Sequence, residues 1–95
     1  MESTNNNNMT MNEIFAKTFR KIIIETMEEL FQQYMLSNYG ENFGEECFFN
    51  FVKKNEKNIK LMVNILLIEN FTSISQIEDY TYNLVCNYIT FPPIE

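Results

Sequence analysis

The hydrophobic residues between Thr10 and Gly40 recur with the period of an α-helix. Steps of three and four positions place them on one face: Phe15, Phe19, Ile22, Ile23, Met27, Leu30, Phe31, Tyr34 and Met35. Thr10 followed by Glu13 is the pattern of a capping box, in which each side chain accepts a hydrogen bond from a free backbone N–H. Gly40 can adopt the left-handed conformation that ends many helices. The pattern predicts a helix of about 28 residues, about 40 Å long, on which the rest of the chain packs.

A shorter amphipathic pattern follows and ends near Asn55. Its apolar positions are Phe43, Cys47, Phe48, Phe51 and Val52. Asn42 and Glu45 form a second pair that can cap the start of this helix. The phenylalanines of this stretch are more than one helix face can bury, so we expect Phe49 to be exposed. Such rings indicate either a partner surface or the packed core of a phenylalanine-rich bundle.

The segment from Asn58 to Phe71 is apolar on nearly all sides. Its β-branched residues also fit a buried strand, whereas its length and neighbours favour a helix that is covered on most sides. If the rest of the chain does not cover it, Ile59–Ile68 is an interface.

A last helical pattern precedes a proline-containing end. Its apolar and aromatic positions are Ile77, Tyr80, Thr81, Leu84, Val85, Tyr88 and Ile89. Ser75 with Glu78 can cap its start. Phe91 is followed by two prolines, which lack an N–H donor and have a fixed φ, so residues 92–95 are expected to be extended. The Asn-rich residues 1–9 have little to bury and are expected to be disordered, which leaves residues 10–91 as one helical domain.

These patterns predict an all-α fold, a small four-helix bundle-like domain built on the long first helix. The chain has only 2 glycines and 2 prolines in 95 residues, which favours long helices over a turn-rich fold. The expected core residues are Phe19, Ile23, Leu30, Phe51, Met62, Leu66, Leu84 and Val85.

The charge of the chain argues against several classes of partner. Its 13 acidic and 7 basic residues give a net charge of −6, whereas binding to nucleic acid requires clustered lysine and arginine. The same deficit disfavours anionic membranes. Four lysines, Lys53, Lys54, Lys57 and Lys60, lie close together; they fit a solvated helix end that complements the dipole better than a binding patch. With neither a secretory signal nor an apolar stretch of membrane-spanning length, the chain is expected to be cytoplasmic.

The residue types disfavour an enzyme. Without histidine the chain lacks the base of Ser–His or Cys–His catalysis, and two cysteines alone do not form a zinc site. Gly40 and Gly44 are not followed by the lysine of a phosphate-binding loop. The carboxylates of 25–29 and 41–46 fit a solvated surface better than a catalytic pair. We therefore expect no cofactor and no metal.

The two cysteines, Cys47 and Cys86, allow one disulfide. Buried free thiols in a reducing compartment are the favoured interpretation, because unpaired cysteine is among the most buried residue types. A disulfide between the two cysteines is the alternative interpretation.

An apolar helix end, an acidic turn and a phenylalanine-rich helix with trailing lysines follow one another in Met35–Lys54, MLSNYGENFGEECFFNFVKK. This order resembles the first half of a regulator of G-protein signalling (RGS) domain. Aligned without gaps, Gly44-Glu45-Glu46-Cys47 falls on the acidic turn of that family, and Phe51 falls on its tryptophan. Ile68–Ser73 looks like the family's Tyr-x-x-Phe-Ile-Ser element.

The resemblance implies binding to the alpha subunit of a heterotrimeric G protein. Members of the family brace the switch regions of that subunit and supply no catalytic residue. Their contact asparagine is Cys47 in this chain, so only Glu45 and Glu46 carry over as candidate contacts. The family's last helices have no counterpart after Ile94, which would make this chain a truncated or diverged relative.

Taken together, these observations predict a non-enzymatic protein–protein interaction domain with an adaptor or regulatory role. The candidate partner contacts are Glu41, Glu45, Glu46 and Phe49. Three alternatives stay open. The first is the RGS-like domain that binds a G-protein alpha subunit. The second is a self-associating helical protein, in which a second copy covers Ile59–Ile68 to form a homodimer. The third is an inactive gene fragment.

Overall fold

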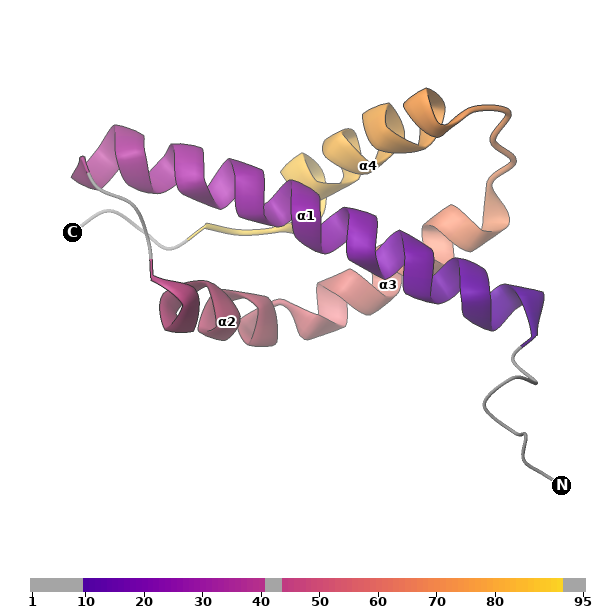
Figure 1. The fold of residues 1–95 in the computed structure, drawn as a ribbon, viewed down its shortest axis with the longest axis horizontal. Helices are drawn as coiled ribbons and strands as arrows, with labels where there is room; N and C mark the ends of the chain where they lie inside the picture. Colours follow the sequence, from indigo (N-terminus) through magenta and orange to yellow (C-terminus); the bar gives the residue numbers. More distant parts are fainter. Residues whose placement is uncertain (1–9, 41–43, 92–95) are drawn as a thin grey trace, which may run out of the picture.

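Four α-helices make up the fold in a computed structural model, which describes residues 10–40 and 44–91 (Figure 1). They are α1 (Met11–Tyr39), α2 (Glu45–Lys54), α3 (Glu56–Ile68) and α4 (Ile74–Tyr88), and the described residues contain no strand. The predicted all-α class with a long first helix is therefore confirmed. The predictions for residues 1–9, 41–43 and 92–95, which include the Asn42 cap, lie outside the described residues.

Both ends of α1 have the predicted geometry. The Thr10 hydroxyl accepts a hydrogen bond from the Glu13 N–H at 3.1 Å, and the Glu13 carboxylate accepts one from the Thr10 N–H at 2.8 Å. At the other end Gly40 has a φ of 73°, in the left-handed region, and its N–H donates to the carbonyls of Met35 and Leu36. The capping box and the terminal glycine therefore bound the helix as the sequence indicates.

Helices α2 and α3 are joined through a single residue, Asn55. Its backbone N–H donates to the carbonyls of Phe51 and Val52, and its buried side-chain amide donates to Phe51 O at 2.9 Å. The helical alternative for 58–71 is confirmed over the strand, although α3 begins at Glu56 and ends at Ile68. The polar asparagine thus ends one helix and begins the next without leaving its amide unpaired.

The cap of helix α4 is Ser73, two residues before the predicted cap. Ser73, in an extended conformation, accepts a hydrogen bond from the Gln76 N–H at 3.2 Å, and the Gln76 side chain accepts from the Thr72 N–H at 2.8 Å. The prediction that Ser75 caps this helix is wrong, because Ser75 already lies in its first turn. Two serines close together made the cap ambiguous in sequence, and the path of the 69–73 connection decides between them.

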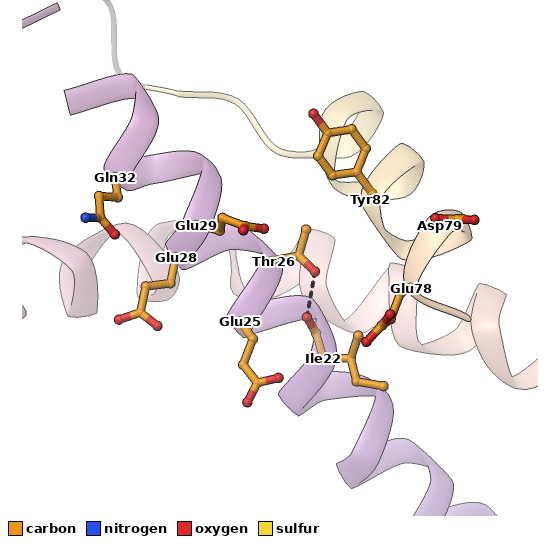
Figure 2. A pocket seen from close by; sticks show the side chains of 9 residues that line it. All are labelled: Ile22, Glu25, Thr26, Glu28, Glu29, Gln32, Glu78, Asp79 and Tyr82. Carbon is orange, nitrogen blue, oxygen red and sulfur yellow. Dashed lines mark hydrogen bonds between the residues drawn. The ribbon is translucent and has the colours of Figure 1, made fainter. Parts of the chain in front are cut away.

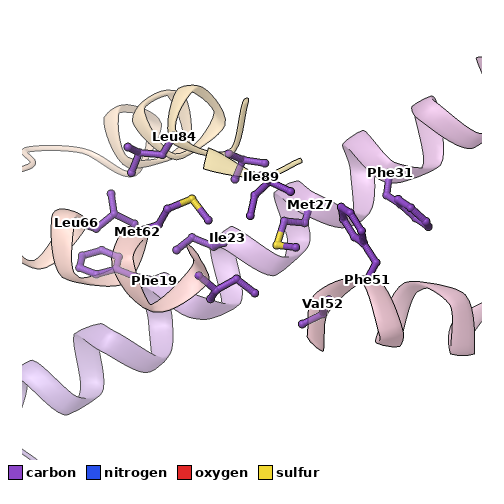
Figure 3. Close-up of a cluster of buried hydrophobic side chains, with 12 residues drawn as sticks. Phe19, Ile23, Met27, Phe31, Phe51, Val52, Met62, Leu66, Leu84 and Ile89 are labelled. Carbon is purple, nitrogen blue, oxygen red and sulfur yellow. The ribbon is translucent and has the colours of Figure 1, made fainter. Parts of the chain in front are cut away.

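The core lies where α1 meets the other three helices (Figure 3). In Figure 1, α1 runs the length of the fold with α4 on one side and α2 on the other, and α3 crosses behind it. The buried residues of α1 recur every fourth position: Phe19, Ile23, Met27 and Phe31. Leu30, expected in the core, is only half-buried, because this spacing brings Phe31 inward instead. The other core residues are Phe51, Val52, Ile59, Met62, Leu66, Leu84, Val85 and Ile89.

An aromatic cluster closes the end of the fold near the C-terminus of α1. The rings of Phe31 and Phe51 stack with centroids 4.5 Å apart. Phe91, which follows α4, returns to this cluster and lies 5.4 Å from Phe51 and 5.3 Å from Tyr34. The chain after α4 therefore continues past α1, toward the end of the fold where α1 and α2 lie (Figure 1).

Candidate interaction surfaces

A shallow groove follows the line where α1 packs beside α2 and α3. It consists of three adjoining hollows of about 300, 340 and 360 Å³, all of which include Arg20 in their walls. The hollow of about 340 Å³ is lined by α1 residues alone and extends the groove over the surface of that helix. Its apolar lining comprises Ala16, Ile24, Phe48, Phe49, Val52 and Val63. Its charged lining comprises Lys17, Arg20, Lys21, Glu25, Glu28, Glu45, Glu56 and Lys60. We call it the α1/α2–α3 groove.

An ion pair between Arg20 and Glu56 crosses this groove. The two guanidinium nitrogens of Arg20 donate to the two carboxylate oxygens of Glu56 at 2.5 and 3.0 Å. This hydrogen bonding from Arg20, together with its charge and that of Lys60, lowers the pKa of the Glu56 carboxyl despite partial burial. Because Glu56 is in the first turn of α3, the pair ties α1 to the α2–α3 junction.

Phe49 stands at one end of the groove and is 61% exposed, as predicted. The ammonium group of Lys53, one turn further along α2, lies 5.2 Å from the centroid of the ring. The adjacent Phe48 points to the interior, where its ring is 5.9 Å from that of Phe31. The half-buried Phe48 thus joins the aromatic cluster and also lines the groove, whereas Phe49 is exposed.

The other predicted contact residues lie at the start of α2. Glu45 and Glu46 occupy its first turn, where a negative charge is favourable to the helix dipole, and both are exposed. Glu45 lines the α1/α2–α3 groove with Phe49, so the fold brings these two candidates together. Glu46 is not in the groove lining, and Glu41 lies outside the described residues.

A larger hollow lies between α1 and α4 (Figure 2). It has a volume of about 590 Å³ and is lined by five exposed carboxylates: Glu25, Glu28 and Glu29 of α1 with Glu78 and Asp79 of α4. Figure 2 shows the carboxylates on both walls, with the exposed Tyr82 on the α4 side. The described lining includes no cation. Sequence reasoning identified the α1 carboxylates as solvated but missed the two from α4, since only tertiary packing places that helix beside them.

A third surface is apolar and lies at the N-terminal end of α1. Ile68 is 79% exposed, Ile74 is 69% exposed and Met11 is 62% exposed. A hollow of about 460 Å³ between α1, the end of α3 and the start of α4 is lined in part by Phe15 and Phe71. This chain covers one face of the Ile59–Ile68 segment, where Ile59, Met62 and Leu66 are fully buried, whereas Leu61 and Ile68 are exposed. The expectation of a helix covered on most sides is therefore wrong, because only the face toward α1 and α4 is packed.

Both cysteines are free and exposed in the described structure. The expectation of buried thiols is therefore wrong, and the alternative disulfide is not formed. The inward positions of α2 are taken by Phe51 and Val52, which leaves Cys47 on the outer side. In α4, Val85 is buried and the next residue, Cys86, faces outward.

Neither a metal site nor a membrane span is found in the part of the chain that the structure describes. No group of three or more His, Cys, Asp or Glu side chains in residues 10–40 and 44–91 is arranged to hold a metal ion. No helix in the same residues is long and apolar enough to cross a membrane.

The fold and these surfaces define an all-α domain of four helices with grooves along both sides of α1. No protein-family model, curated protein or solved structure matches this chain. The resemblance to RGS domains therefore stays a prediction from the sequence.

Proposed function

We propose that this chain is a non-enzymatic protein–protein interaction domain that binds its partner in the α1/α2–α3 groove. The observation that carries the proposal is the exposed ring of Phe49 beside an apolar groove floor. A large aromatic side chain left at the surface can gain the hydrophobic free energy of burial when a partner covers it. Such rings are typical anchors of protein interfaces.

The groove has the composition of an interface. Ile24, Val52 and Val63 form an apolar floor, and charged side chains of both signs surround it. Interfaces commonly combine an apolar centre with a polar rim that fixes orientation. The charged rim would set the orientation of the bound partner, and burial of the Phe49 ring would supply much of the binding free energy.

Catalysis is less well supported by the residues present. The chain has no histidine, and the five carboxylates of the α1–α4 hollow are exposed to water. A carboxyl group that acts as a general acid usually needs burial or a close like charge to hold its proton near neutral pH. These exposed side chains fit an electrostatic surface better than an acid–base pair.

Photo-crosslinking tests the proposal. A photoreactive phenylalanine analogue at position 49 of the full chain is expected to give a discrete protein adduct in an extract of the source cells. The matched control carries the analogue at Asn50, the next exposed residue of α2, which does not line the groove. Absence of an adduct at position 49, or equal adducts at both positions, would overturn the proposed binding surface. Turnover of a substrate that is lost on substitution of Glu45 or Glu46 would overturn the non-enzymatic assignment.

A further inference from the structure

We propose that the α1/α2–α3 groove binds a second copy of this chain across a two-fold axis, an inference that rests on the groove being the interaction surface proposed above. The starting observation is the order of charges along α1. Lys17 and Lys21 are followed one turn later by Glu25 and then by Glu28, and all four are exposed residues on the α1 wall of the groove. Glu25 and Glu28 also line the α1–α4 hollow. The sign of the charge thus reverses halfway along the groove.

The opposite wall of the groove has the same order. Lys60 of α3 lies at the end that includes Lys17, and Glu45 of α2 lies at the end that includes Glu28. Of the other charges here, Glu56 is already paired with Arg20, and the Lys53 ammonium lies over the Phe49 ring. Among the lining residues outside the Arg20–Glu56 pair, one end of the groove is therefore basic on both walls, and the other end is acidic on both walls.

A two-fold axis reverses this order in the second copy. In such an interface the same patch of both copies meets in antiparallel orientation. With the axis between positions 22 and 23, Lys17 faces Glu28 of the second copy, and Lys21 lies beside its Glu25. On the other wall, Lys60 and Glu45 are brought together in the same way. A parallel arrangement would instead oppose like charges, which is unfavourable.

The shape of the groove agrees with the charge order. Phe49 projects at the acidic end, whereas the basic end has the hollow of about 360 Å³ whose apolar walls include Ala16 and Val63. The same two-fold rotation brings each Phe49 over the hollow of the other copy. Ile24, near the axis, adds apolar contact at the centre. The groove thus carries a projecting ring, a hollow that can receive it, and charges of both signs. A surface that pairs with itself requires all of these.

Sedimentation equilibrium of the full chain over a range of concentrations tests this inference. The expected result is a species of twice the 11.4 kDa monomer mass. Exposed charge pairs are screened by salt, so the dimer is expected to weaken between low and high ionic strength. A monomer at every concentration would overturn the inference. The proposed function would survive that result if position 49 still formed an adduct with another protein.

Charge reversal identifies the surface. The variants Lys17→Glu/Lys21→Glu and Glu25→Lys/Glu28→Lys are each expected to be monomeric, because each makes the groove side of α1 uniform in sign. An equimolar mixture of the two is expected to form a heterodimer, which also shows that both variants are folded. The control Glu78→Lys/Asp79→Lys has the same charge change as the second variant but lies outside the groove, and it is expected to remain dimeric.

Substitution of the exposed ring of Phe49 gives a test that does not depend on charge. Phe49→Ala is expected to raise the dissociation constant of the dimer about tenfold or more, and Asn50→Ala to leave it unchanged. A dimer that persists in both charge-reversed variants and in Phe49→Ala would overturn the inference and point to the apolar end of the fold.

Discussion

Thr81 is the one core position where a polar atom is left without a partner among the described residues. Its side chain is fully buried between the helices, and its hydroxyl oxygen has no hydrogen bond there. A buried hydroxyl that loses its bond to water costs about 1–3 kcal/mol. Thr81→Val keeps the shape of the side chain, so it is expected to raise the free energy of unfolding by about 1 kcal/mol.

Urea denaturation measures this difference, and α1 offers a control. The hydroxyl of the half-buried Thr26 donates to Ile22 O at 2.8 Å. Because Thr26→Val removes this hydrogen bond, it is expected to raise the free energy of unfolding less than Thr81→Val does, or to lower it. A loss of stability in Thr81→Val would show that the hydroxyl is satisfied after all.

Glu56 is expected to contribute a pH-dependent part of the stability. Its pKa in the folded state lies below the ordinary value of 4.5, chiefly because of the hydrogen bonds from Arg20. The stabilisation is therefore fully present above that value and is lost as the pH falls through the lower, folded-state value. Both side chains are more than a third exposed, which limits the contribution to about 0.5 kcal/mol.

The variant Glu56→Gln tests this linkage. The free energies of unfolding of the native chain and the variant are expected to differ at pH 7 and to converge as the pH falls below 4.5. A difference that is constant across this range would show that the ion pair does not contribute.

Single residues show how far a pattern in the sequence determines the position of a side chain. The exposure of Phe49 was predictable, because one helix face has room for only some of the neighbouring phenylalanines. The exposure of Cys47 was not, since residue type alone favours burial. Leu30 and Phe31 are adjacent and both apolar, and only the packing of Phe51 and Phe91 against this end of α1 selects Phe31.

At the scale of the helices, the start of α4 allows two candidate caps, Ser73 and Ser75, to be compared. Ser73 is the observed cap, so Ser73→Ala is expected to lower the free energy of unfolding by about 1 kcal/mol. Ser75→Ala is expected to have little effect or to stabilise slightly, because alanine is favoured within a helix. Thermal denaturation followed by circular dichroism measures both variants, and the reverse order would reinstate Ser75 as the cap.

The residues after α4 also contribute to stability. Phe91 is half-buried in the aromatic cluster and contacts rings from both α1 and α2. Complete burial of a phenylalanine makes its replacement by alanine cost about 3–5 kcal/mol, so Phe91→Ala is expected to cost about 2 kcal/mol. The urea midpoint of this variant should fall, and an unchanged midpoint would mean that α1 and α2 hold together without this ring.

At the scale of the whole molecule, one continuous core joins all four helices. We therefore expect a single cooperative unfolding transition in which far-ultraviolet circular dichroism and the near-ultraviolet tyrosine signal coincide. The gene-fragment alternative predicts a broad melt with separate transitions, because its core would lack the helices needed to complete it. This measurement on the full chain separates the two.

The long helix and its boundaries were determined by local chemistry. A periodic apolar stripe, the Thr10–Glu13 capping box and a glycine at position 40 act within a few residues of each other, so the sequence alone predicts them. The four-helix class follows for the same reason, since each apolar stripe must be covered by another helix.

The surfaces were decided by tertiary structure. Glu78 and Asp79 lie near the α1 carboxylates only because α4 packs beside α1. Glu45 and Phe49 line the same hollow as Arg20 only because α2 packs along α1. A surface depends on which helices become neighbours and at what rotation, and these are set by many long-range contacts that leave no periodic trace in the chain. The sequence therefore determined the elements of this protein, whereas the packing of those elements determined its grooves.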